Sequence, residues 1–148
     1  SWLAVCGVPV GASLTEDRLR SAERGSIIVV VATDAPLLPT QITRLARRAA
    51  LGIGRGGTPS GNSSGDIFLA FSTANSPGPL PEPPTLAFTT LGNERLDPLF
   101  LAVVEAVDEA VLNAMLAAEP MTGHRGRRVA ALDGERVSEL VLGRRSSG

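Results

Sequence analysis

Two short runs of consecutive apolar residues predict the strands of this chain. Residues 27–33 form an almost unbroken, β-branched apolar run between Gly25 and Asp34, which is typical of a strand buried on both faces. Residues 67–73 form a second apolar run between turn-forming residues. Because strands that are apolar on both faces need layers on both sides, the pattern predicts a layered α/β fold.

Two stretches with apolar residues at helical spacing predict long helices. Pro39 can occupy the first turn of one helix, whose apolar pattern stops at Gly52. In the other, Asp97 is expected to cap the helix and Pro98 to take its first position, and the pattern runs to Pro120. The apolar stripes comprise Leu38, Ile42, Leu45 and Ala49 in the first helix, and Phe100, Val104, Val107, Val111, Met115 and Ala118 in the second.

Weaker patterns cover the rest of the chain. Residues 2–10 alternate loosely and predict a strand, and residues 12–25 have the polar composition of a tether. The proline-rich residues 76–84 are expected to cross the surface within one domain, because too little chain follows to form an independent core. A short strand is expected over residues 85–91, and a last short helix over residues 132–142.

The composition favours a globular protein and gives no indication of a nucleic acid or membrane partner. With 148 residues and 43% hydrophobic content, the chain can bury a real core as one domain or part of one. Its 14 basic residues nearly balance 15 acidic ones, so a net charge of -1 gives no electrostatic reason to expect nucleic acid or an anionic membrane as a partner. No apolar run approaches the roughly 20 residues that span a bilayer, and residues 1–11 lack the basic start of a secretory signal. We expect a soluble, cytoplasmic protein, with a periplasmic location as the alternative.

The single cysteine and the single histidine predict no metal site. Cys6 cannot form an internal disulfide, and Cys6 with His124 falls short of the usual three or four metal ligands. We expect Cys6 to be a small buried hydrophobe and His124 to be a solvated loop residue. No cofactor is expected.

Candidate chemistry begins at the mouth of the first predicted strand. Gly25 lacks a Cβ and leaves its carbonyl carbon open to attack by the neighbouring Ser26. A serine hydroxyl needs a base within about 3 Å, and an amino-terminal serine carries one on its own Cα. The pKa of such an α-amine is ordinarily about 7.7 to 8.0, so a useful fraction is neutral near physiological pH. On spacing alone, however, a simple turn before a strand is the commoner explanation of a Gly-Ser pair.

Two other motifs fit their usual structural contexts poorly. Residues 52–57 contain G-x-G-x-x-G, but a dinucleotide site needs this loop after a strand and before a helix, whereas here it follows a helix. Ser63 lies in G-x-S-x-G, and with Asp108 and His124 it has the chain order of an α/β-hydrolase triad. The nucleophile of that fold sits between a strand and a helix, whereas Ser63 precedes a strand.

Three segments resemble the DmpA-type family of self-cleaving aminopeptidases, which includes D-/L-aminopeptidase-esterases and β-peptidyl aminopeptidases. These segments are residues 26–55, 61–75 and 96–123. In that family the precursor is cut at a Gly-Ser bond, and the new amino-terminal serine is the nucleophile. The resemblance therefore implies cleavage between Gly25 and Ser26, with Ser26 as the nucleophile. It also matches Ser64 and Asp66 to the family's accessory hydroxyl and carboxylate.

The resemblance makes the expected architecture more specific. It implies a four-layer αββα sandwich of the DmpA/ornithine acetyltransferase type, of which this chain is the C-terminal part. Residues 1–25 would be the end of the larger first subunit with its cleavage tether, and residues 26–148 the nucleophile-bearing subunit. The expected partners are that first subunit, which should supply most of the oxyanion hole, and further copies in a homo-oligomer of heterodimers.

The function implied is that of a self-processing aminopeptidase or amidase-esterase. It would release amino-terminal residues from peptides, amides or esters through an acyl-Ser26 intermediate. Ser64 would hydrogen-bond the Ser26 amine or hydroxyl, and Asp66 would orient Ser64 or hold the ammonium of the substrate. One alternative is an acyltransferase of the ornithine acetyltransferase type, although those relatives use threonine at the cut. A non-catalytic fragment or assembly subunit is the other.

Overall fold

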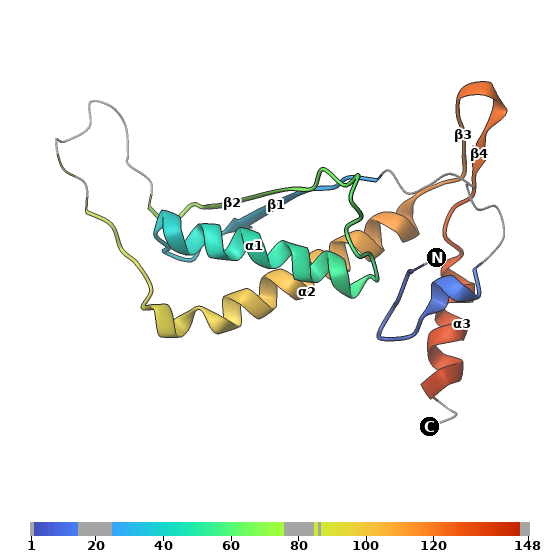
Figure 1. Cartoon of the computed structure of the whole chain (residues 1–148). Helices are drawn as coiled ribbons and strands as arrows, with labels where there is room; N and C mark the ends of the chain where they lie inside the picture. The colour runs from blue at the N-terminus through green and yellow to red at the C-terminus, as the bar shows by residue number, and fades with distance from the viewer. Residues whose placement is uncertain (1, 15–24, 76–84, 86, 146–148) are drawn as a thin grey trace.

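The computed structural model describes residues 2–14, 25–75, 85 and 87–145. Most of the predicted tether and the proline-rich segment, residues 76–84, lie outside the described residues. The main elements, shown in Figure 1, are β1 (Ile28–Thr33), α1 (Pro39–Arg55), β2 (Ile67–Ser72), α2 (Asp97–Ala117) and α3 (Gly134–Arg145). Both predicted long strands and all three predicted helices are confirmed.

The two long strands form a parallel pair joined by α1. Their register runs from Ile28 opposite Ile67 to Thr33 opposite Ser72. Parallel strands need a crossover connection, and α1 provides it as a β-α-β unit. Because parallel strands start at the same edge of a sheet, the residues that precede β1 and β2 must lie close together.

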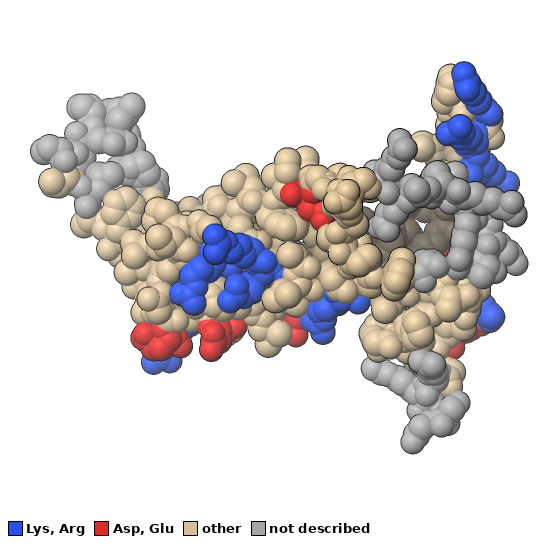
Figure 2. Space-filling view, viewed as in Figure 1, with Lys and Arg blue, Asp and Glu red and all other residues tan. Residues whose placement is uncertain are grey.

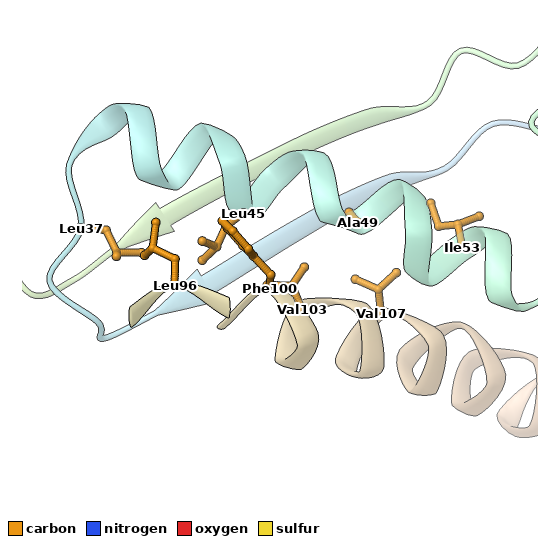
Figure 3. Packing of buried hydrophobic residues seen from close by; sticks show 8 residues of the cluster. All are labelled: Leu37, Leu45, Ala49, Ile53, Leu96, Phe100, Val103 and Val107. Atoms are coloured by element: carbon orange, nitrogen blue, oxygen red, sulfur yellow. The ribbon is translucent and has the colours of Figure 1, made fainter. Parts of the chain in front are cut away.

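One layer of helices covers one face of this sheet. α1 and α2 pack against each other and against the inward side chains of the strands. Leu45 of α1 and Leu96, which precedes α2, are almost completely buried between these layers. The eight core residues drawn in Figure 3 are Leu37, Leu45, Ala49, Ile53, Leu96, Phe100, Val103 and Val107. The β1–β2 pair and the α1–α2 pair thus provide one sheet and one helical layer of the expected sandwich.

Gly52 lies inside α1 and does not end it, which corrects the expectation from the apolar pattern. The helix continues to Arg55. A Cβ at Gly52 would lie 2.7 Å from the carbonyl oxygen of Val104 and 2.7 Å from the Cβ of Val107. The missing side chain therefore allows α2 to cross α1 at close range.

The opposite face of the sheet is exposed, so the prediction of strands buried on both faces is wrong for this chain by itself. Exposed fractions on this face range from 71% for Ile28 to 44% for Phe71. The apolar residues of the exposed face are Ile28, Val30, Ile67, Leu69 and Phe71. A contiguous apolar surface of this kind usually marks an interface. The described residues of this chain provide no layer to cover it.

Residues 2–10 form a turn rather than the predicted strand. Val5 and Val8 exchange backbone hydrogen bonds of 3.0 and 2.9 Å across Cys6 and Gly7, which both have positive φ. A 3-10 helix, η1 (Val10–Ala12), follows. Cys6 is exposed at the tip of the turn, so the prediction that it is buried is also wrong.

Two expectations around α2 need correction. The predicted strand over residues 85–91 forms no ladder among its described residues. Instead, the side chain of Asn75 holds the backbone of Thr89 through a pair of hydrogen bonds of 2.9 and 3.0 Å. Asp97 is the first residue of α2 and makes no capping hydrogen bond, while Leu96 occupies the cap position. A short 3-10 helix, η2 (Asn93–Arg95), leads into it.

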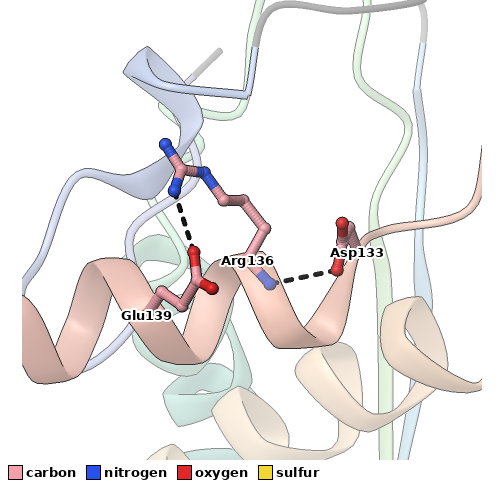
Figure 4. A network of polar contacts seen from close by, with 3 residues as sticks. All are labelled: Asp133, Arg136 and Glu139. Carbon is pink, nitrogen blue, oxygen red and sulfur yellow. Dashed lines mark hydrogen bonds and ion pairs between the residues drawn. The ribbon is translucent and has the colours of Figure 1, made fainter.

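The C-terminal region consists of a small hairpin followed by α3. The hairpin pairs β3 (Met121–Thr122) with β4 (Arg128–Val129) around η3 (His124–Gly126), and His124 is exposed, as predicted. In Figure 4 the carboxylate of Asp133 accepts a 3.0 Å hydrogen bond from the backbone N–H of Arg136 in the first turn of α3. The same figure shows the 2.9 Å ion pair between Arg136 and Glu139.

Arg44, Arg47 and Arg48 form an arginine patch on the outer surface of α1, where Figure 2 shows a group of basic side chains. The guanidinium carbons of Arg44 and Arg48 lie 5.0 and 4.1 Å from the ring centre of Phe100. These cation-π contacts cover the outer side of a core residue. Within the described parts of the chain, no helix combines the length and the apolar character that crossing a membrane requires.

Candidate active site

Ser26, Ser64 and Asp66 lie at the edge where β1 and β2 begin. Ser26 stands two residues before Ile28, and Gly65 stands two residues before its partner Ile67, so the parallel register brings Ser26 and Gly65 opposite each other. The backbone N–H of Gly65 donates a 2.9 Å hydrogen bond to the Oγ of Ser26. The three predicted site residues are therefore together in space.

The carboxylate of Asp66 is the centre of a small hydrogen-bond network. Its Oδ1 accepts from the hydroxyl of Ser64 at 2.5 Å and from the backbone N–H of Ile27 at 3.2 Å. Its Oδ2 accepts from the hydroxyl of Ser60 at 3.2 Å. The hydrogen bond from Ser64 is the main cause that lowers the pKa of Asp66, and Ile27 and Ser60 add to it against a partial loss of hydration. Asp66 is therefore an ionised acceptor at neutral pH.

The network limits what Ser64 can do. A serine hydroxyl has one proton to donate, and that of Ser64 points to Asp66. Ser64 can then meet the amine or hydroxyl of Ser26 only as a hydrogen-bond acceptor. Of the two roles considered for Asp66, orienting Ser64 has a direct contact in the structure.

Ser60 is a member of this network that sequence reasoning missed. Its backbone has a φ of 49°, a left-handed conformation that is uncommon for serine. The Ser60 N–H donates a 3.2 Å hydrogen bond to the Oγ1 of Thr58, which supports this turn and directs the Ser60 hydroxyl to Asp66. The glycine- and serine-rich composition of residues 52–66 predicts a loop there, but it does not distinguish Ser60 from its neighbours.

A cavity of about 440 Å³ lies beside Ser26 and has walls of opposite character. One wall is polar and comes from the loop before β2, including Ser60, Ser64 and Asp66. The other is apolar and consists of Ile53 from α1 with Val111 and Met115 from α2. The arrangement can hold a small organic group next to a serine hydroxyl and a carboxylate.

The two competing motifs do not form sites. Gly52 and Gly54 lie within α1, and the loop that follows leads into a strand, so no helix N-terminus is available for a dinucleotide. Ser63 also precedes a strand, and neither Asp108 nor His124 lines the cavity beside it. Asp108 instead pairs with Arg55 at 3.6 Å. Among the residues that the structure describes, no group of three or more His, Cys, Asp or Glu side chains could hold a metal.

The chain is similar in sequence to known proteins. The family model described as Peptidase family S58 matches residues 1–129. Beta-peptidyl aminopeptidase BapA of Sphingosinicella microcystinivorans is 41% identical to this chain in a match that covers 88% of this chain and 37% of that protein. Its namesake from Sphingosinicella xenopeptidilytica is 36% identical over 97% of this chain and 35% of its own length. The chain thus spans about a third of the length of these curated relatives.

A solved structure matches the fold as well. The l-aminopeptidase d-ala-esterase/amidase of Ochrobactrum anthropi superposes with a TM-score of 0.89 at 49% identity, covering 97% of this chain and 40% of that one. It is described as a prototype for the serine aminopeptidases and as a new variant of the Ntn hydrolase fold. The likeness confirms the predicted α/β class and gives this chain the fold of the matching part of an Ntn hydrolase.

Proposed function

The chain belongs to peptidase family S58, and from this membership we propose that it is part of a precursor that cuts itself between Gly25 and Ser26 to become an aminopeptidase or amidase-esterase. The observation that carries the proposal is the position of Ser26. Ser26 lies just before β1, and its hydroxyl accepts a hydrogen bond from the N–H of Gly65. The hydroxyl lies next to a cavity and to the ionised Asp66. Cleavage at this bond would turn an internal serine into an amino-terminal one.

The atoms that react in the cut all come from Gly25, Ser26 and water. The Oγ of Ser26 attacks the carbonyl carbon of Gly25, the C–N bond to Ser26 breaks, and the acyl group moves from nitrogen to oxygen. Water then hydrolyses this ester. The products are the Gly25 carboxylate and a Ser26 that has its hydroxyl back and a free α-amine.

Turnover then uses the new amine as the base. In its neutral form it accepts the hydroxyl proton while Ser26 Oγ attacks the substrate carbonyl, and it passes the proton to the leaving amine or alcohol. Water releases the acyl group by the same route in reverse. Because Asp66 binds the N–H of Ile27, its negative charge lies one residue from this amine. We assign Ser64 and Asp66 the roles of accessory acceptor and carboxylate beside the nucleophile.

The substrates that suit the cavity are peptides, amides or esters with a free amino terminus. Asp66 lines the polar wall and offers a negative charge to a substrate ammonium, while the apolar wall can take a side chain. The relatives fit this class, because they are named as beta-peptidyl aminopeptidases and as an l-aminopeptidase d-ala-esterase/amidase.

The larger first subunit is the proposed partner. The exposed apolar face of the β1–β2 sheet supports this, because burial of residues such as Ile28 and Leu69 requires another layer. We assign that layer, and most of the oxyanion hole, to a first subunit that corresponds to the part of the relatives that this chain does not span. Further association into a homo-oligomer of heterodimers is part of the same proposal.

Trapping the acyl-enzyme tests the function directly. The mature protein is mixed with an amino-acid ester that deacylates slowly, quenched in acid and mapped by mass spectrometry. The added acyl mass should lie on the peptide that begins at Ser26, and Ser26→Ala should remove it. An acyl group on Ser63 in place of Ser26 would contradict the proposal.

A further inference from the structure

The segment upstream of the proposed cut is docked on residues that lie downstream of it. Val5 and Val10 are buried against Val137 of α3, with exposed fractions of 9, 1 and 5%. Partly buried apolar residues surround them: Leu3, Val8, Leu14, Leu112, Leu132, Leu140 and Val141. This second core joins the start of the chain to α2 and α3, although the sequence pattern suggests only a tether and a loose strand there.

The same segment also meets the end of α1. The backbone N–H of Ala4 donates a 3.0 Å hydrogen bond to the carbonyl oxygen of Gly56. Gly57 has a φ of 103°, and a Cβ at this position would collide with the carbonyl oxygen of Trp2. A glycine at position 57 is therefore required both by the backbone angle and by the approach of the upstream segment.

This contact lies next to the loop that carries the site. Gly57 directly precedes Thr58, whose Oγ1 accepts from the Ser60 N–H, and the Ser60 hydroxyl in turn reaches Asp66. The position of Trp2 and Ala4 thus fixes the start of the site loop, residues 57–66. The other end of this loop is fixed by β2.

We propose that residues 2–12 stay bound after the cut and act as a brace that positions the site loop from across the subunit boundary. The inference rests on the proposed cleavage between Gly25 and Ser26. None of the docking contacts involves that bond, and the last residue of the brace precedes it by 13 positions. Cleavage therefore leaves each of these contacts in place and converts them into a subunit interface.

Chemical cross-linking tests whether the brace stays bound. Cys6 is exposed, and it lines a cavity of about 280 Å³ together with Glu109 of α2. In the complete precursor carrying Glu109→Cys, a short bismaleimide should join the two subunits of the mature protein into one band. Peptide mapping should identify the Cys6–109 link. Arg47→Cys, an exposed position on the arginine patch of α1, is the control that should give no such link.

The outcomes separate this inference from the proposed cleavage. If the reagent leaves the two subunits of Glu109→Cys as separate bands, the brace has dissociated. That result would overturn the inference, while the cleavage would stand. A single band before any reagent would overturn the cleavage, and peptide mapping would still show whether Cys6 lies beside position 109.

A pair of glycine variants tests the positioning role. Gly57→Ala should lower the Cys6–109 cross-linking yield and lower kcat per titrated active site at least tenfold, with the same helix content by circular dichroism. Gly54→Ala is the matched control, because a Cβ there meets nothing within 4 Å, and it should stay within twofold on both measures. A mature Gly57→Ala enzyme with wild-type kcat per site would overturn the positioning role.

Discussion

The backbone N–H of Gly65 donates a 2.9 Å hydrogen bond to the Oγ of Ser26, although 39 residues separate them in the sequence. The contact follows from the parallel register of β1 and β2, which brings the two residues before the strands to the same edge. It fixes the position of the hydroxyl in the uncut chain. It also places Ser26 beside the loop that carries Ser64 and Asp66.

Replacement of the histidine and the cysteine should leave the enzyme working. In the proposed mechanism the α-amine of Ser26 replaces the histidine of a conventional triad. His124→Ala and Cys6→Ala should each keep kcat/KM within a few fold of wild type, whereas Ser26→Ala should abolish both processing and turnover. Steady-state rates on an amino-acid amide measure this. A loss of several orders of magnitude in folded His124→Ala would instead favour the Ser63 triad.

The charge of Asp66 should affect the pH profile of the enzyme. A nearby carboxylate favours the ammonium form of the Ser26 amine and so raises its pKa. Asp66→Asn removes this charge with little change in shape, so the ascending limb of kcat/KM should move to lower pH. If Asp66 holds the substrate ammonium instead, the limb should stay in place while KM rises for substrates with a free amine. Unchanged rates, KM and pH profile in Asp66→Asn would remove Asp66 from the site.

Asp66 should also contribute to stability in a way that depends on pH. Its pKa in the folded chain lies below the ordinary value of 3.8, chiefly because of the hydrogen bond from Ser64. The contribution of Asp66 to the free energy of unfolding is therefore complete above the pKa that its carboxyl has in the unfolded chain. It is lost as pH falls through the lower pKa of the folded chain. Urea unfolding should show a stability gap between wild type and Asp66→Asn that narrows in this acidic range. A gap that stays constant from neutral pH to about pH 2 would contradict the network.

The close crossing of α1 and α2 should make Gly52 sensitive to substitution. Gly52→Ala places a Cβ 2.7 Å from the backbone oxygen of Val104, and should lower the free energy of unfolding by about 1–3 kcal/mol. Gly54→Ala, in the same helix but facing open space, should raise it by about 0.4–1 kcal/mol because the unfolded chain loses freedom. Equal denaturation midpoints for the two variants would show that the crossing is not tight.

Much of the fold was predictable because the strongest local patterns coincide with the core. The apolar runs gave β1 and β2, and the stripes through Leu45 and Phe100 gave α1 and α2. The prediction that Gly52 ends α1 was wrong, because a glycine that ends a helix and a glycine that allows close helix packing cannot be distinguished in a single sequence. The difference depends on Val104 and Val107, which lie about fifty residues away and touch Gly52 only in the folded chain.

The strand faces show a second limit of sequence reasoning. An apolar run such as residues 27–33 predicts that both faces of the strand are buried, but it does not indicate which polypeptide covers each face. In this chain the inward face packs on helices, and the face with Ile28 and Val30 is exposed among the described residues.

The site itself was partly predictable. The Gly25–Ser26 pair is visible in the sequence, but its interpretation as a cleavage site, and the matching of Ser64 and Asp66, came from family resemblance rather than from spacing. Ser60 was missed because its role depends on a left-handed backbone angle and on a turn held by Thr58. The docking of residues 2–12 was missed because their buried side chains have no simple period.

The most direct test of the proposed mechanism is the intact mass and amino-terminal sequence of the mature protein from the complete precursor. The expected result is two polypeptides, of which the second begins Ser-Ile-Ile-Val at Ser26. A precursor with Ser26→Ala should remain one chain of full mass. A fully active enzyme in which the bond between Gly25 and Ser26 is still intact would contradict the account.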